Sequence, residues 1–490
     1  MFLIDSDATH TRRTFLRRAG QLGLAGTAMP LALNLAAMGD AAAQTATDYK
    51  ALVCVFLFGG NDYANTVITY DDPSYNAYNT IRGGVTATQE AGGIALAKAA
   101  LTPTLLAPTV PLAGGRQYAL HPAMTALTGL FNTGNVAVQL NVGPLVVPLT
   151  KAQYNSGPRT TYPVPPKLFS HNDQQSTWQS SSPEGSTVGW GGNIGDLVMN
   201  GNGSSLFTCI SVSGNAVFLS GDSALSYQVG TGGAVQIQPA RTGGSTYGSA
   251  EVNKAMAALI QQARGHTLEN EYNRVTARAI GAADTVNGAI GTALTGFPAA
   301  NNLGDQLHMV ARLIKGRGNL GAKRQVFFVS MGGFDLHDNL VANQVGLMQR
   351  LSDAMAAFHA QMVTQGLQNN VTAFTASDFG RTLASNGDGT DHGWGSHHLV
   401  VGGAVKGKAI YGTPPPVSIA STSADADQWH VGQGRLLPTT SVDQYAATLA
   451  KWFGVSDSDM NGILPNLKNF GVTPPSGIAY PKDVGFMNPA

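Results

Sequence analysis

Aspartate and histidine residues recur in short, glycine-containing segments that lie far apart along the chain. The candidate ligands in these segments are Asp62, Asp335, His337, Asp378 and His392. Carboxylate and imidazole groups bind divalent ions of hard or borderline character. If these segments meet in the folded chain, the sequence predicts a site for zinc, magnesium, manganese or calcium.

Each of these residues also has a purely structural interpretation. Asp62, Asp335 and Asp378 each follow an apolar run, and aspartate is a preferred cap of turns and helices. Asp335 and His337 are two residues apart, so both side chains point the same way from an extended segment, which favours joint ligation. His392 follows an aspartate in a glycine-flanked loop, which favours a metal or phosphate contact.

Ser170 precedes Asp173 by three residues, a spacing that resembles a capping box and predicts a helix start. A serine at a helix N-terminus beside a divalent ion is also a plausible nucleophile, because both the ion and the helix dipole stabilise its ionised form. Capping alone is the competing interpretation.

Three further residues are candidates for contact with a substrate. The planar guanidinium of Arg381 suits an anionic group, although an ordinary surface ion pair is the alternative. Adjacent strand residues point to opposite faces, so one of His397 and His398 should face the core. Asn61 and His398 complete the candidates for substrate binding.

Strand-like and helix-like segments alternate along the chain. Continuous apolar runs predict strands at 51–58, 136–142, 325–330, 371–375 and 399–401. Helices are predicted at 122–132, 250–282 (one or two), 306–314, 348–362 and 441–453. This rhythm predicts an α/β fold, a three-layer sandwich with a central, mostly parallel sheet. Ligands of such sheets bind outside the carboxyl ends of the strands.

The first 43 residues have the three parts of an export signal. Arg12-Arg13 precedes Phe15-Leu16, an apolar small-residue run spans 19–37, and Ala41-Ala42-Ala43 suits signal peptidase. Paired arginines before Phe-Leu favour the twin-arginine route. We therefore expect the twin-arginine translocase and signal peptidase as partners, a mature chain from residue 44 to 490, and a periplasmic or secreted protein.

Composition excludes some partners and leaves other points open. Without the four arginines and three aspartates of residues 1–43 the net charge is −1, which gives no electrostatic footprint for nucleic acid. No later apolar run reaches the length of a membrane anchor. A disulfide between Cys54 and Cys209 is possible in an oxidising compartment. Residues 200–300 are a possible helical cap insertion.

Several blocks, in this order, resemble the domain-of-unknown-function 1501 family. They are Phe169–Gln175, Gly332–Asn339, Ser377–Thr382 and Asp391–Gly393. The resemblance covers nearly the whole mature chain. That family in turn resembles the alkaline phosphatase-like superfamily of phosphatases and sulfatases, which implies a central sheet between helix layers with one or two metals at its edge.

The resemblance also implies roles for individual residues. Asp62 takes the place of the acidic ligand after the first strand, and Ser170 that of the nucleophile. Asp335 and His337 resemble the ligands of one metal; Asp378 and His392 resemble the remaining ligands. Phe379 stands where the superfamily has a histidine, which leaves the second metal short of ligands.

Two hypotheses of different classes follow. The first is a metal-dependent hydrolase of small phosphate or sulfate esters, in which Ser170 or water attacks and Arg381 or His398 holds the anion. The second is a non-catalytic surface or assembly protein that keeps the fold with a degenerate metal site.

Overall fold

The computed structural model describes residues 48–83, 93–472 and 477–489. The export signal expected in residues 1–43 lies outside these residues and stays a prediction. Within the described ranges, no helix is both long enough and apolar enough to cross a membrane.

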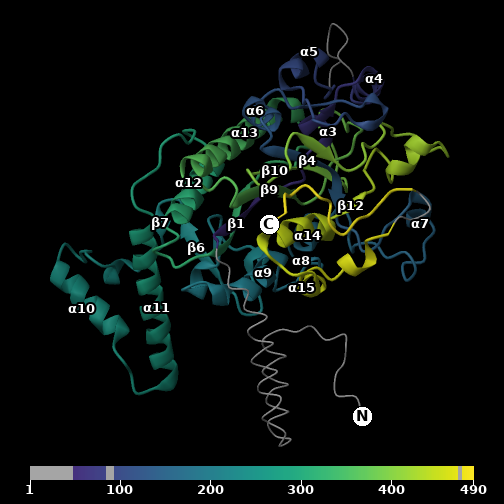
Figure 1. Cartoon of the computed structure of the whole chain (residues 1–490). Coiled ribbons are helices and arrows are strands. Elements are labelled where there is room, and N and C mark those ends of the chain that lie inside the picture. Colours follow the sequence, from purple (N-terminus) through teal and green to yellow (C-terminus); the bar gives the residue numbers. More distant parts are fainter. Residues whose placement is uncertain (1–47, 84–92, 473–476, 490) are drawn as a thin grey trace, which may run out of the picture.

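A large sheet forms the centre of the molecule (Figure 1). The described residues give it ten strands in the order β11-β4-β10-β9-β1-β8-β5-β6-β7, with β12 paired to β4. The long strands are β1 (Lys50–Leu57), β4 (Val136–Gly143), β8 (Arg324–Met331), β9 (Val371–Ser377) and β10 (Ser396–Val401). The short ones are β5 (Cys209–Ser211), β6 (Ser226–Gly230), β7 (Gly233–Ala234), β11 (Ala409–Tyr411) and β12 (Thr440–Ser441). A separate hairpin pairs β2 (Val67–Thr69) with β3 (Tyr118–Leu120).

The predicted mostly parallel sheet is confirmed. β1 pairs in parallel with both β8 and β9, and β5 pairs in parallel with β8 and β6. β10 is antiparallel to both of its neighbours, β4 and β9. Because β10 runs in the opposite direction, the residues that precede it lie at the same sheet edge as the residues that follow β1, β8 and β9.

Helices cover both faces of the sheet and complete the three layers. Alternate side chains of β1 enter two separate cores, with Val53 and Val55 on one side and Cys54 and Phe56 on the other. The first core is closed by α6 (Thr125–Asn132), α12 (Asn302–Lys315) and α13 (Leu340–Thr364). The second is closed by α8 (His171–Ser180), α9 (Trp190–Val198), α14 (Val442–Phe453) and α15 (Asp457–Ile463).

The remaining helices lie at the periphery. Four short or medium helices are α3 (Tyr63–Thr66), α4 (Asp72–Ile81), α5 (Lys98–Leu101) and α7 (Lys151–Asn155). The segment 250–282 forms two helices, α10 (Ala250–Gln261) and α11 (Thr267–Ala289). They extend away from the body as an arm (Figure 1). Its use as a cap over a site remains a prediction.

The structure settles two points that the sequence left open. His397 and His398 are both buried, because helices or loops cover both faces of β10 and each ring enters a different layer. Cys54 and Cys209 are free thiols. They lie on β1 and β5, which are separated by β8, so about two strand spacings of 4.8 Å divide them, too far for a disulfide.

A buried carboxyl on α14 makes stability depend on pH. Burial raises the pKa of Asp443 from 3.8 to about 6, against hydrogen bonds from Asn466 and Ser181. The folded state therefore binds more protons than the unfolded state between these values, so the free energy of unfolding falls as pH rises through this window.

We predict that Asp443→Asn stabilises the protein at pH 7.5 by roughly 3 kcal/mol, since two pKa units correspond to that amount and the amide oxygen still accepts both hydrogen bonds. The gain should vanish near pH 4. Urea denaturation at both pH values measures it, with Asp222→Asn at an exposed position as control. An equal gain at both pH values would contradict the explanation.

Candidate functional site

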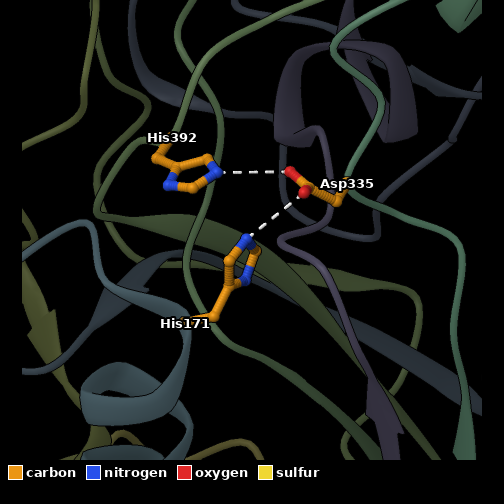
Figure 2. Close-up of side chains that lie close together, drawn as sticks. All are labelled: His171, Asp335 and His392. Atoms are coloured by element: carbon orange, nitrogen blue, oxygen red, sulfur yellow. Dashed lines mark ion pairs between the residues drawn. The ribbon is translucent and has the colours of Figure 1, made fainter.

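His171, Asp335 and His392 converge at the edge of the sheet where β8 ends and β10 begins. Their nearest ligand atoms all lie within 4.8 Å of one another. Figure 2 shows both imidazole rings turning a nitrogen toward the two oxygens of Asp335. His171 is the first residue of α8, Asp335 follows β8, and His392 precedes β10.

Glycines at the end of β1 allow this close approach. A Cβ at Gly59 would lie 2.4 Å from the backbone nitrogen of Asp335, and one at Gly60 would lie 2.5 Å from the ring of Phe379. Both glycines have positive φ angles, 115° and 85°, which residues other than glycine rarely adopt. The Gly59-Gly60 pair thus brings β1 against the loops that follow β8 and β9.

The distances from Asp335 to the imidazole nitrogens around it match those between ligands of one ion. His171 Nε2 lies 3.3 Å from Asp335 Oδ2, and His392 Nε2 lies 3.3 Å from Asp335 Oδ1. His337 Nε2 lies 3.0 Å from Asp335 Oδ1 and 3.1 Å from His392 Nε2. Tetrahedral ligands with bonds of about 2.0–2.1 Å are roughly 3.3 Å apart.

Hydrogen bonds at the far side of each ring fix its orientation. His171 Nδ1 lies 2.6 Å from Asp378 Oδ2, and His392 Nδ1 lies 2.7 Å from the carbonyl oxygen of Phe169. Carbonyl and carboxylate oxygens only accept, so each Nδ1 carries the hydrogen and donates it. The Nε2 atoms of both rings consequently face Asp335. Metal-binding histidines have this same arrangement.

The local charges favour an anionic Asp335. Burial raises the pKa of this carboxyl, but the hydrogen bond and charge of Arg381 outweigh it and lower the pKa. The hydrogen bond with Asp378 raises the pKa of His171, whereas burial lowers that of His392. The cluster therefore contains one firmly ionised carboxylate among imidazoles.

Arg381 holds Asp335 in place through a hydrogen bond of its guanidinium. Its buried guanidinium donates to Asp335 Oδ1 at 2.6 Å, to the Gly59 carbonyl at 3.3 Å and to Thr390 Oγ1 at 3.2 Å. A further hydrogen bond reaches the carbonyl of Thr390. These contacts position Asp335 and engage the guanidinium that the sequence suggested for anion binding.

Asp378 acts through His171. Its Oδ2 accepts hydrogen bonds from His171, from Gln175 Nε2 at 2.8 Å and from the Gly59 amide at 3.2 Å. The neighbouring Phe379 ring packs against His171 and His392, with centroids 4.8 and 4.7 Å away. Asp378 therefore orients a candidate ligand, and an aromatic ring walls this side of the cluster.

Three other predicted site residues are not in the cluster. Asp62 caps α3 and forms a buried two-point ion pair with Arg82, at 2.6 and 2.7 Å. Asn61 is buried and accepts a hydrogen bond from Thr66 Oγ1. His398 packs against Trp178 inside the second core, where burial lowers its pKa to about 3.

Ser170 directly precedes His171 of the cluster in the chain. The predicted helix start is confirmed, since Ser170 is the N-cap of α8. The predicted capping hydrogen bond is wrong: Ser170 Oγ donates instead to Asp173 Oδ2, at 2.9 Å. Phe169, one residue earlier, has a φ of 74°, a strained value for a side-chain-bearing residue, and strain of this kind gathers at functional sites.

Sequence reasoning missed His171, Arg82 and Arg435. His171 directly follows the helix start that was identified, and its place in that segment was the available signal. Arg82 lies in the chain 20 residues beyond Asp62, with no pattern to connect them. Arg435 donates from Nε to the His392 carbonyl at 2.7 Å, and its guanidinium lies 5.3 Å from the centre of the Phe169 ring.

The geometry predicts a large stability role for the Asp62–Arg82 pair. Arg82→Ala leaves a buried carboxylate without its partner, which should lower the free energy of unfolding by about 3–5 kcal/mol. Lys98→Ala removes an exposed ion pair with Asp72 and should cost less than about 1 kcal/mol. Chemical denaturation compares the two variants; similar losses would contradict the structural role of Asp62.

Comparison with known proteins places the chain in a family. The comparison with curated proteins finds no match. A family model described as "Protein of unknown function (DUF1501)" matches residues 49–464, a range that contains every residue of the cluster. The chain therefore belongs to the DUF1501 family of proteins of unknown function.

Proposed function

We propose that this chain is an exported, metal-dependent hydrolase of phosphate or sulfate esters whose ion is held by His171, Asp335 and His392. The observation that carries the proposal is the orientation of the two rings. Each ring has its Nδ1 fixed by an acceptor, and each directs its Nε2 toward the same carboxylate.

The spacing of the nitrogens supports a cation at this point. His337 and His392 have their Nε2 atoms 3.1 Å apart, and two lone pairs at that distance repel unless a proton or an ion lies between them. His171 Nε2 is buried and makes no well-aligned hydrogen bond with a described residue, although Asp335 Oδ2 lies 3.3 Å away. A buried nitrogen without a partner is costly, and ligation of an ion removes that cost.

The donor set favours a borderline metal such as zinc or manganese. Two or three imidazoles with one carboxylate suit these ions, whereas magnesium and calcium prefer oxygen ligands. When bound, such an ion polarises a non-bridging oxygen of the ester and lowers the pKa of a nearby hydroxyl or water.

Ser170 is the proposed nucleophile. Its hydroxyl donates to Asp173, which is positioned to take the proton as the oxygen attacks phosphorus or sulfur. The N-terminus of α8 stabilises negative charge at this position. The attack breaks the bond from phosphorus or sulfur to the alcohol oxygen, and the alcohol leaves with the proton that Asp173 returns. Water then hydrolyses the ester on the serine and regenerates the hydroxyl.

Arg435 is better placed than Arg381 to hold the anionic group. Its side chain is partly exposed and stacks on Phe169, the residue before the serine. Its Nε donates to the His392 carbonyl, and its two terminal nitrogens make no hydrogen bond with the described residues. These nitrogens provide the planar pair of donors that phosphate and sulfate oxygens fit.

One observation favours the non-catalytic alternative. Both oxygens of Asp62 are bound by Arg82, and Phe379 occupies the place of a second-metal ligand, so a second ion has few donors. A protein that binds one structural ion and turns over no ester would fit this arrangement.

Titration calorimetry with zinc and manganese tests the ion site. We expect one ion per chain, with affinity lowered at least about 100-fold in His171→Ala because a ligand is lost. Asp378→Ala should weaken binding by about 10–100-fold, because it removes the acceptor that orients His171. His266→Ala, an exposed histidine on the arm, is the matched control. Unchanged binding in His171→Ala would refute the assignment.

Turnover of 4-nitrophenyl phosphate and 4-nitrophenyl sulfate by the metal-loaded protein tests the chemistry. Ser170→Ala should abolish turnover while ion binding persists. Arg435→Ala should raise KM by about tenfold or more, with Arg435→Lys in between and exposed Arg241→Ala unchanged. Ion binding with no turnover of either ester by the unmodified protein would instead support the non-catalytic alternative.

A further inference from the structure

Helix α11 carries an apolar stripe that faces solvent. Leu268, Tyr272 and Val275 are 75%, 71% and 49% exposed, and Ala279 is also exposed. These residues step by four, three and four, the repeat that places side chains along one side of a helix. Isolated exposed apolar residues are ordinary, but a continuous stripe of this kind marks an interaction surface.

The stripe is separate from the contacts that attach α11 to the body. The buried residues of α11 lie mostly in its C-terminal half, at Ala282, Ala283, Val286 and Ala289. This half packs near β7 and α12, and the N-terminal half projects with α10 (Figure 1). The stripe thus begins on the part of the helix that projects from the body together with α10.

Charged residues border the stripe in a self-complementary pattern. Glu271 and Arg278 directly precede Tyr272 and Ala279, and they lie on one side of the helix, 3.2 Å apart between their charged atoms. When two such helices lie antiparallel, Glu271 faces Arg278 of the partner subunit, and the same contact repeats by symmetry. A parallel alignment gives neither residue an opposite charge.

Side-chain volumes agree with the same alignment. In an antiparallel pair centred between Tyr272 and Val275, Tyr272 of one copy lies opposite Val275 of the other. Leu268 of one copy then lies opposite the small Ala279 of the other. Each large residue then meets a smaller one, which allows close packing along the seam.

We propose that α11 is the self-association surface of this protein and that its occupant is a second copy of the chain, related by a two-fold axis with the two α11 helices antiparallel. One helix pair alone buries less than the roughly 1,200 Å² of a standard interface. α10 adds Val252 and Leu259, seven residues apart and both exposed, so the two arms pair as helical hairpins.

Sedimentation equilibrium of the purified protein from 1 to 100 µM tests the proposal. The unmodified protein should be a dimer in this range. Tyr272→Lys should raise the dissociation constant at least about 100-fold, whereas Val345→Lys, an exposed valine on α13, should leave it unchanged. A monomer throughout, or a dimer unaffected by Tyr272→Lys, would overturn the proposal.

Charge reversal separates a contact between copies from one within a chain. Glu271→Arg and Arg278→Glu should each weaken self-association, because like charges then face each other across the seam. An equimolar mixture of the two variants should form a heterodimer, since every pair is again of opposite charge. Failure of the mixture to associate more tightly than either variant alone would refute the antiparallel pairing. Binding of the monomer to phosphatidylglycerol vesicles would identify a membrane surface as the occupant and overturn it as well.

Discussion

The candidate site depends on one carboxylate, that of Asp335, which a hydrogen bond from Arg381 holds in place. The guanidinium keeps this carboxyl ionised despite its partial burial, and it fixes the oxygen to which His337 and His392 turn. The second oxygen faces His171. Without this fixed anion the imidazoles have no common point to face, and the cluster becomes a set of unrelated rings.

The fold makes this meeting possible through strand direction. β1, β8 and β9 are parallel, so their following loops share an edge, and the reversed β10 brings His392 to that edge from the other end of its strand. Gly59 and Gly60 then remove the side chains that would keep the loops apart. The sheet topology therefore determines where Asp335 and His392 meet. His171 comes from α8, a helix that covers the sheet.

Much of this could be predicted from the sequence, because the relevant signals are local. The apolar runs predict β1, β4, β8 and β9, and polar residues directly after a parallel strand must lie at its carboxyl end. The parallel-sheet argument thus brought Asp335, His337 and Asp378 to one edge, and the loop before β10 placed His392 with them. Chain polarity and hydrophobic periodicity require no knowledge of side-chain contacts.

What could not be predicted depends on pairing between distant side chains. Nothing in the sequence connects Asp62 with Arg82, yet that ion pair decides that Asp62 lies apart from the cluster. Likewise, the sequence leaves Arg381 as either a surface residue or an anion binder. Only the structure shows that its guanidinium is bound by Asp335 and Thr390. His398 lies on a strand with both faces covered, and only the packing of Trp178 shows that it is enclosed.

Anomalous X-ray diffraction at the zinc edge, from crystals of the protein grown with zinc, tests the central claim most directly. The account predicts a single strong peak about 2.0–2.2 Å from Nε2 of His171, Nε2 of His392 and an oxygen of Asp335. Data that show His171 and His392 with their Nε2 atoms turned away from Asp335, or zinc bound only elsewhere, would contradict it.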